Sequence, residues 1–363
     1  MGDKGKALKR SRWSGRAMTA SFRAMDRAAT RAGIPFSDAA MIRPNIDQWL
    51  FNVSHYGVMI PNLPEPFCYF SLMAILGTAG NQLIDTDHML VDKPSRNATQ
   101  ISGTAIPETG QFASYSMDRD CEIHSDGSLI QFGSDVRLSG LYPTVRLEVT
   151  REAFGLDITL RCHDNVTWFA DTPIYKHLGL MADYEGHLDY EGQRVPISGA
   201  CTYEYFKMVS PYGFISRPLS YRRKVPMDFF SYQILDIDDE IQLMLAKVCM
   251  TGETLLEAAW MRRRGAPSAT FAESTRFEVT EFEEEPRIAP DARQMLLPKA
   301  FVWTVLDGDE TIARIEGHVD TPFTYGLCSG YVGGYAYRGE LEGRPIEGRA
   351  YIEYVDTALF HKC

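Results

Sequence analysis

The chain has 363 residues, of which 45% are apolar and 23% are charged, and its net charge is −11. This composition is typical of a folded protein long enough for two domains, and it excludes disorder, collagen and coiled coil as descriptions of the whole chain. No run approaches the length of a spanning helix and the N-terminus lacks a secretory h-region, so we expect a cytoplasmic protein. The seven cysteines are scattered and form no C-x-x-C, which argues against both a disulfide framework and a zinc site.

Residues 1–33 differ in charge from the rest of the chain. They contain three Lys and six Arg against Asp3 and Asp26, a net charge of +7, so the remaining residues carry −18. An acidic body argues against a nucleic-acid-binding core, because neutralising phosphates requires clustered cations. We therefore expect no nucleic-acid partner.

This basic arm carries an apolar stripe at three- and four-residue steps, which predicts an amphipathic helix that ends near Gly33 and Pro35. The stripe comprises Trp13, Ala17, Met18, Phe22, Met25 and Ala29. Such a helix can dock on an anionic membrane surface, pack on the acidic body, or fray. Peripheral membrane contact through residues 1–33 is therefore one expectation among three.

After residue 44, short runs rich in Val, Ile, Tyr, Phe and Thr alternate with clusters of Gly, Pro, Asp and Asn. This pattern is typical of an all-β sandwich or barrel. Asp126-Gly127 and Asp307-Gly308 lie between such runs and predict hairpin turns. Outside the arm, only residues 252–261 and 291–297 have a composition that allows a helix.

Four short matches occur in the same order in both halves of the body. They pair Asp171-Thr172-Pro173 with Asp320-Thr321-Pro322, residues 196–205 with 345–354, 146–150 with 276–280, and 66–71 with 226–231. An ordered set of matches predicts a duplicated unit, with an arm over 1–43, a first β unit over 44–206 and a second over 207–363. Loop insertions, one of them at 281–291, then account for the unequal offsets. Convergent hairpin composition is the alternative explanation.

The last predicted strand of each unit carries a carboxylate, Glu204 in the first and Glu353 in the second. Strand alternation places each carboxylate on the face opposite an aromatic neighbour. The two can form paired carboxylates in two sites, or close strand ends through arginine pairs. Glycine-aromatic strands such as residues 330–335 suit the sharp bending of barrel closure, and a closed unit has room for one small ligand.

A tandem of lipocalin-like (calycin-like) β-barrel units that ends in the pattern Gly-x-x-x-x-Glu-Tyr over Gly348 to Tyr354 resembles the AttH-like and carotenoid 1,2-hydratase group. The resemblance covers about residues 44–363, and Trp49 lies where such proteins often open with a tryptophan. It implies cofactor-free acid–base chemistry on apolar, isoprenoid-like or polyketide-like molecules: hydration, isomerisation or cyclisation.

Candidate catalytic residues are titratable side chains in aromatic surroundings, since G-x-G-x-x-G, P-loop, H-E-x-x-H and G-x-S-x-G signatures are absent from the sequence. A histidine near a carboxylate acts as general acid or base near neutral pH, and a tyrosine can hold a proton or a developing charge. These considerations select His177, Asp183 and either Tyr175 or Tyr331. The alternatives are a rim histidine bonded to backbone for His177 and a turn residue for Asp183.

Five further residues are expected to bind the ligand, one histidine, one carboxylate and three aromatic side chains. They are His55, Tyr184, Trp303, Tyr325 and Glu353. Strand alternation turns His55 and Tyr56 to opposite faces, so only one of the two can face inward.

Asp85-Thr86-Asp87-His88 has the composition of a metal cluster, but a loop with Asx turns explains it as well, and no further ligands are spaced to complete a site. We predict neither a metal nor an organic cofactor.

Two classes of function fit the sequence, and a third uses the arm. The first is a cofactor-independent lyase or isomerase of hydratase type that acts on a hydrophobic small molecule. The second is a non-catalytic carrier for a hydrophobic ligand. The third is a scaffold that lies on a membrane or partner through the arm.

Overall fold

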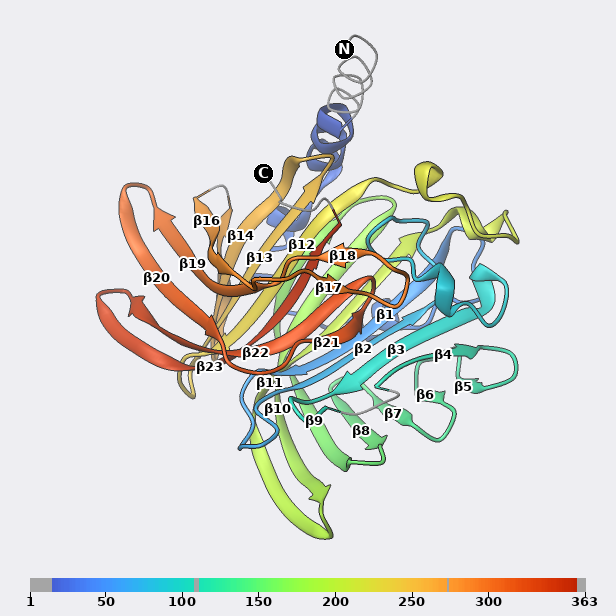
Figure 1. Ribbon diagram of the computed structural model, residues 1–363, viewed down its shortest axis with the longest axis horizontal. Helices are drawn as coiled ribbons and strands as arrows, with labels where there is room; N and C mark the ends of the chain where they lie inside the picture. The colour runs from blue at the N-terminus through green and yellow to red at the C-terminus, as the bar shows by residue number, and fades with distance from the viewer. Residues whose placement is uncertain (1–14, 108–110, 273, 358–363) are drawn as a thin grey trace.

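The computed structural model describes residues 15–107, 111–272 and 274–357, which form an almost entirely β structure (Figure 1). Two strongly curled, barrel-like antiparallel sheets follow one another along the chain and pack together. This architecture confirms the predicted all-β fold. Among the described residues, no helix is long and apolar enough to cross a membrane.

The first sheet has eleven strands in the order β4-β3-β2-β1-β11-β10-β9-β8-β7-β6-β5. Its strands are β1 Phe51–Ile60, β2 Phe70–Leu76, β3 Asn97–Gly103, β4 Phe112–Ser116, β5 Cys121–Ile123, β6 Leu129–Phe132, β7 Val136–Leu141, β8 Thr144–Thr150, β9 Phe154–Asp171, β10 Tyr175–Tyr190 and β11 Gln193–Val209.

The second sheet has ten strands in the order β15-β14-β13-β12-β23-β22-β20-β19-β16, with β21 paired to β22. Its strands are β12 Met227–Asp236, β13 Ile241–Met250, β14 Glu253–Arg263, β15 Ala266–Ala272, β16 Thr275–Phe282, β19 Pro298–Asp307, β20 Glu310–Val319, β21 Thr324–Leu327, β22 Gly330–Leu341 and β23 Arg344–Asp356. A separate hairpin consists of β17 Arg287–Ile288 and β18 Gln294–Met295.

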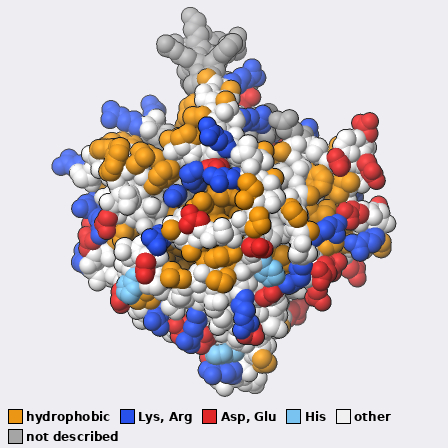
Figure 2. All heavy atoms as spheres, turned by 180° about the vertical axis from the view of Figure 1, so that it is seen from behind, with side chains coloured by type: hydrophobic (Ala, Val, Ile, Leu, Met, Phe, Trp, Pro, Cys, Tyr) orange, Lys and Arg blue, Asp and Glu red, His pale blue; other side chains and the backbone are white. Residues whose placement is uncertain are grey.

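Residues 15–25 are helical, and short 3-10 turns lie in the connections. These turns are η1 Ala28–Arg31, η2 Ala39–Ile42, η3 Asp87–Met89, η4 Pro94–Arg96, η5 Pro211–Gly213 and η6 Tyr221–Arg223. Figure 2 shows hydrophobic side chains gathered below the N-terminal helix, with charged side chains among them. The helix ends at residue 25 rather than near Gly33, because the chain turns there to contact β9: Asp26 accepts from the amide of Asp171, and the amide of Arg27 donates to the carbonyl of Asp171.

Strand alternation separates two faces of the first sheet. On β11, Cys201, Tyr203 and Tyr205 point into the core of the first unit, whereas Phe206 on the opposite face packs with residues of the second unit. The outer face of the first sheet is therefore buried by the second sheet, which places side chains of both units in one contact layer.

The two body segments whose composition allows a helix are not helical. Residues 253–261 lie in the strand β14, and 291–297 include β18. β14 pairs with β13 and β15, and β18 pairs with β17, and this pairing satisfies backbone groups that a short helix would leave unpaired at its ends. The predicted hairpin turns at Asp126-Gly127 and Asp307-Gly308 do join β5 to β6 and β19 to β20.

Two of the four internal matches occupy equivalent places in the two sheets. Asp171 ends β9 and Asp320 follows β20, and each of these strands lies two places from the last strand of its sheet. Glu204 and Glu353 lie on the last strands β11 and β23, each paired with the first strand of its sheet. Residues 146–150 and 276–280 do not correspond, since β8 lies three strands from β11 and β16 lies four strands from β23 along the sheets.

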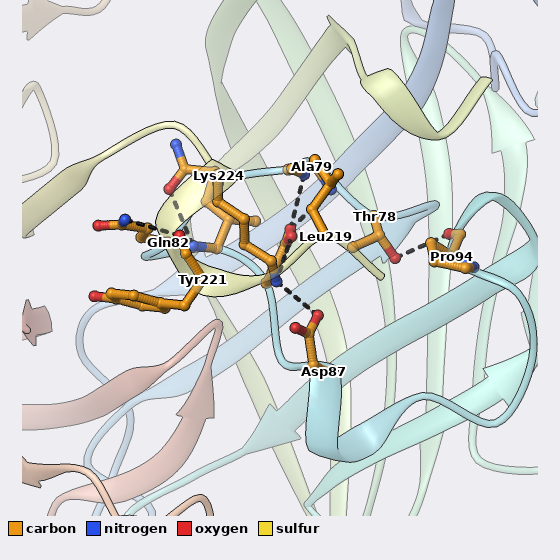
Figure 3. A network of polar contacts seen from close by, with 12 residues as sticks. Thr78, Ala79, Gln82, Asp87, Pro94, Leu219, Tyr221 and Lys224 are labelled. Carbon is orange, nitrogen blue, oxygen red and sulfur yellow. Dashed lines mark hydrogen bonds and ion pairs between the residues drawn. The ribbon is translucent and has the colours of Figure 1, made fainter. Parts of the chain in front are cut away.

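The connection between the sheets, residues 210–226, is held on the first unit by polar contacts (Figure 3). Val225 forms an isolated parallel bridge with Asn81, and Gln82 donates to the carbonyl of Tyr221. Lys224 is buried and forms ion pairs with Asp85 (2.9 Å) and Asp87 (2.6 Å). The cluster that resembled a metal site thus binds a lysine, and the described residues contain no group of three or more side chains arranged to hold a metal.

The described cysteines depart from the expectation of no disulfide at one position. Cys249 is disulfide-bonded, whereas Cys68, Cys121, Cys162, Cys201 and Cys328 are free.

We expect Lys224→Met to lower the free energy of unfolding by about 3 kcal/mol, because it leaves the buried carboxylate of Asp85 without its cation. Urea unfolding at neutral pH measures this change. The matched control is Arg222→Met in the same turn, whose exposed side chain should change stability by less than about 0.5 kcal/mol. Equal effects of the two substitutions would contradict the structural role of the Lys224 ion pairs.

Candidate active site

A cavity of about 1700 Å³ lies between the two sheets. Strands β1, β2, β9, β10 and β11 line it from the first unit, and β12, β13, β14, β16 and β23 from the second. Most of its lining side chains are apolar or aromatic. Few polar groups face it, so those that do are candidates for chemistry or for orienting a ligand.

Strand register brings a small polar cluster to one wall of this cavity. His55 on β1 and His177 on β10 are both paired with Phe206 on β11, one on each side. Glu204 lies two residues before Phe206 and therefore on the same face. Three adjacent strands thus present His55, Glu204 and His177 together, and all three line the cavity.

Glu204 is the centre of the cluster. One of its carboxylate oxygens lies 3.5 Å from Nε2 of His177 and 4.0 Å from Nε2 of His55. The hydroxyl of Tyr232, from β12 of the second unit, donates to the other oxygen. Burial favours the protonated form of Glu204, but the interactions with His177, His55 and Tyr232 outweigh it and lower the pKa below its usual value. Glu204 is therefore an ionised carboxylate in an apolar cavity.

The two histidines differ in their surroundings. Nδ1 of His55 lies 3.1 Å from the carbonyl of Ala74 and donates to it, which leaves Nε2 as an acceptor in the cavity. Burial lowers the pKa of His55 to about 4, so its ring is neutral near pH 7. Nδ1 of His177 lies 2.9 Å from the hydroxyl of Tyr175, which donates to it when Nε2 carries the ring proton toward Glu204.

A second carboxylate lines the same cavity in the opposite protonation state. Glu353 on β23 is buried, and its burial together with the nearby charge of Glu204 raises its pKa far above the usual value. Tyr351 donates to one oxygen of Glu353 (2.8 Å), and Ser71 lies 2.7 Å from the Tyr351 hydroxyl. Two carboxyl groups whose surroundings drive their pKa values apart are the usual arrangement of an acid and a base.

Arg262 on β14 is a buried cation close to this cluster. Its guanidinium donates to Thr167 (2.9 Å) and Thr202 (3.2 Å) of the first unit and to Gln242 (2.9 Å) of the second. A Cβ added at Gly179 would lie 2.6 Å from Nη2 of Arg262, so the glycine leaves room for the guanidinium. A buried cation at this depth favours the ionised form of Glu204.

Of the sequence-predicted residues, His177, Tyr175, His55 and Glu353 line the cavity. Asp183 does not line it, because its carboxylate forms an ion pair with Arg264 (2.6 Å) and contacts His163 (2.9 Å) near the surface.

The other predicted residues lie in the packing around the cavity. Tyr184 points into the core of the first unit, and Trp303 stacks on Phe277 in the second, with ring centroids 4.5 Å apart. Tyr325 packs against Tyr331 (5.4 Å), and neither lines the cavity. Their predicted roles in binding or catalysis stay predictions without support from this geometry.

Sequence reasoning did not select Glu204, Tyr232 or Arg262 for the site. Glu204 carried a signal, because it matches Glu353 in the last strand of each unit. Its partners are His177 and Tyr232 rather than an arginine, and the two glutamates share one cavity. Nothing in the sequence around Tyr232 or Arg262 distinguishes them from ordinary strand residues.

The N-terminal helix covers the cavity. Ala17, Met18, Phe22 and Met25, which belong to the predicted apolar stripe, line it. Arg16 forms an ion pair with Glu253 (2.9 Å) of the second unit. The apolar stripe therefore packs on the body in this structure, as one of the three interpretations expected, while Trp13 lies outside the described residues.

We expect the stability of the protein to fall between pH 6.5 and about pH 4 through His55. Its folded pKa of about 4 lies below the unfolded value, so the unfolded chain binds a proton in this window and the folded chain does not. The contribution of His55 to the free energy of unfolding is fully present above about pH 6.5, and roughly 3 kcal/mol of it is lost as the pH falls to about 4.

Urea unfolding across this pH range tests the prediction. His55→Gln should remove this part of the pH dependence, whereas the same substitution at the exposed His124 should retain it. An unchanged pH slope in His55→Gln would contradict the assignment.

The fold and its family follow from comparison with known proteins. The chain is similar to the crystal structure of a putative AttH from Nitrosomonas europaea (TM-score 0.61, 12% identity, 90% of this chain and 98% of the other). It is also similar to kievitone hydratase from Nectria haematococca (TM-score 0.52, 12% identity, 90% and 95%). These likenesses confirm the AttH-like fold expected from the sequence. No curated protein matches the sequence. A family model matches residues 73–362, and the chain belongs to this family, a family of unknown function (DUF6670).

Proposed function

We propose that this protein is a cofactor-independent lyase or isomerase, of hydratase type, that acts on an apolar small molecule in the cavity between the sheets. The observation that carries the proposal is the pair of buried carboxyl groups, an ionised Glu204 beside His177 and a protonated Glu353, facing one large apolar cavity. An apolar carrier has no need of such groups, since each buried ionisable group costs folding free energy.

The arrangement provides both halves of an acid–base reaction. In a hydration, the acid O–H of Glu353 gives its proton to one carbon of a double bond, and water adds to the other carbon. The Tyr175 hydroxyl accepts the proton that the water loses as its own proton passes to Nδ1 of His177, and the charge of Glu204 stabilises the imidazolium that forms. Loss of that proton from His177 and reprotonation of Glu353 complete the cycle. The ring faces of Phe169 and Phe206, which also line the cavity, stabilise positive charge on the carbon. Without the addition of water, the same two groups move a double bond.

The size of the cavity constrains the substrate. Ligand pockets usually enclose about 300–1,000 Å³, and the volume here is about 1700 Å³. Together with the apolar lining, this volume favours a long or polycyclic apolar molecule, in agreement with the isoprenoid-like or polyketide-like class that the family resemblance implies. The likeness in fold to kievitone hydratase also supports hydratase chemistry.

We expect the purified protein, incubated with an apolar metabolite extract and no added cofactor, to convert at least one metabolite. Untargeted mass spectrometry would detect a gain or loss of one water, or an isomer of unchanged mass. His177→Ala and Glu204→Gln should each lower the rate by about 10²- to 10⁴-fold, the usual contribution of a general acid or base. His187→Ala, on the same strand but outside the cavity lining, is the matched control and should retain activity.

A carrier would behave differently in the same experiment. Native mass spectrometry would find a bound apolar molecule, no metabolite would be converted, and His177→Ala would leave binding unchanged. That result would replace the enzymatic proposal with the alternative, a binding protein for a hydrophobic ligand.

A further inference from the structure

Four exposed apolar side chains lie on two segments whose backbones meet at the junction of the two units. Trp49 and Leu50 precede β1, and Phe214 and Ile215 follow η5 in the connection between the sheets; their exposed fractions are 70%, 40%, 75% and 38%. Most large apolar side chains of this protein are buried, so a cluster that includes a tryptophan and a phenylalanine this exposed requires an explanation. We call these four residues the junction patch.

The junction patch is held rigidly. The side chain of Asn52 donates to the carbonyl of Ser210 (3.1 Å) and accepts from its amide (2.8 Å). A Cβ added at Gly213 would lie 3.2 Å from the carbonyl of Trp49, so the two segments are in contact. Farther along the connection, the ion pairs of Lys224 fix its other end (Figure 3). The apolar side chains are therefore presented to solvent by a fixed backbone.

The charge around the junction patch is opposite to that of the body. Residues 210–226 contain Arg217, Arg222, Arg223 and Lys224 and no Asp or Glu, although the chain as a whole is acidic. Arg217, Arg222 and Arg223 are exposed, and their side chains form no hydrogen bond or ion pair within the part of the chain that the structure describes. On the other segment, Asp47 is already paired with Arg96 (3.0 Å).

From this combination we propose that the junction patch docks the protein on an anionic lipid bilayer. Tryptophan and phenylalanine side chains insert at the level of the headgroups, and exposed arginines on the same connection attract anionic lipids. An anionic bilayer offers an apolar layer and a negatively charged surface side by side, which is the combination that this patch and its arginines match.

The position of the junction patch fits the cavity. Pro211 and Val225, on the same connection, line the cavity, while Phe214 and Ile215 face solvent. One short segment therefore separates the cavity from the docking surface, and an apolar molecule dissolved in a bilayer would meet the protein beside the cavity wall. The docking proposal does not depend on the cavity being catalytic.

The experiment is co-sedimentation of the full-length protein with vesicles of phosphatidylcholine alone or of phosphatidylcholine mixed with phosphatidylglycerol. We expect binding to the mixed vesicles that weakens as salt concentration rises. The double substitution Trp49→Ala, Phe214→Ala should lower the partition coefficient by about tenfold or more, and Arg217→Gln, Arg222→Gln, Arg223→Gln should remove the preference for anionic lipid. Ile288→Ala, which removes an apolar side chain 69% exposed elsewhere, is the matched control and should bind as the unchanged protein does.

Three results would overturn the proposal. One is the absence of binding to the mixed vesicles. Another is binding that survives the Trp49 and Phe214 substitutions but is lost on deletion of residues 1–33, which would assign the contact to the arm. The third is self-association in analytical ultracentrifugation that the double substitution abolishes while vesicle binding is unchanged, which would identify a second copy as the occupant.

Discussion

The buried carboxylate of Glu204 depends on both units, because an ionised group removed from water must be stabilised by partners on every side that water has left. His55 and His177 approach it from the strands on either side of β11, and Tyr232 donates to it from the facing sheet. Arg262 reaches across the same layer to Thr167 and Thr202. If the second sheet were displaced, Glu204 would lose the hydrogen bond from Tyr232. The ionised form of Glu204 therefore depends on the packing of the two units.

Glu204 and Glu353 occupy equivalent strands but differ in protonation state, because their neighbours differ. Both lie on the last strand of their sheet, yet Glu204 is paired with two glycines, Gly57 and Gly179, and Glu353 with Tyr232 and Val332. The glycines lie two residues from His55 and His177, whose rings approach Glu204 from the adjacent strands. Without a basic neighbour on its own sheet, and with the charge of Glu204 nearby, Glu353 stays protonated. A fold that places the last strands of both sheets against one cavity therefore yields an acid and a base without a cofactor in the proposed mechanism.

The sequence was sufficient for the fold class and insufficient for the site, for physical reasons. Alternating apolar residues and turn dipeptides report local backbone preference, which is why the hairpins after Asp126 and Asp307 could be predicted. The two internal matches separated by 149 residues, at Asp171 and at Pro196, mark equivalent strands, whereas the matches with other offsets reflect similar β composition.

The site could not be predicted in the same way. Strand alternation places His177 and Asp183 on the same face of β10, but it carries no information on what covers that face. Because β10 extends past the cavity, His177 packs against Phe169 whereas Asp183 forms an ion pair with Arg264. Contacts across the interface, such as Tyr232 to Glu204, have no local signal.

Two segments that line the cavity differ in how firmly they are held. The N-terminal helix is attached through apolar side chains that line the cavity and through exposed contacts such as Arg16 to Glu253, and exposed ion pairs contribute little to stability. The connection between the sheets is fixed by the buried Lys224 and its two aspartates. An apolar ligand would extend the apolar surface on which Met18 and Phe22 pack and so strengthen the attachment of the helix, whereas it would leave the connection unchanged. The helix is thus held on the cavity less firmly than the connection, part of which lines the same cavity.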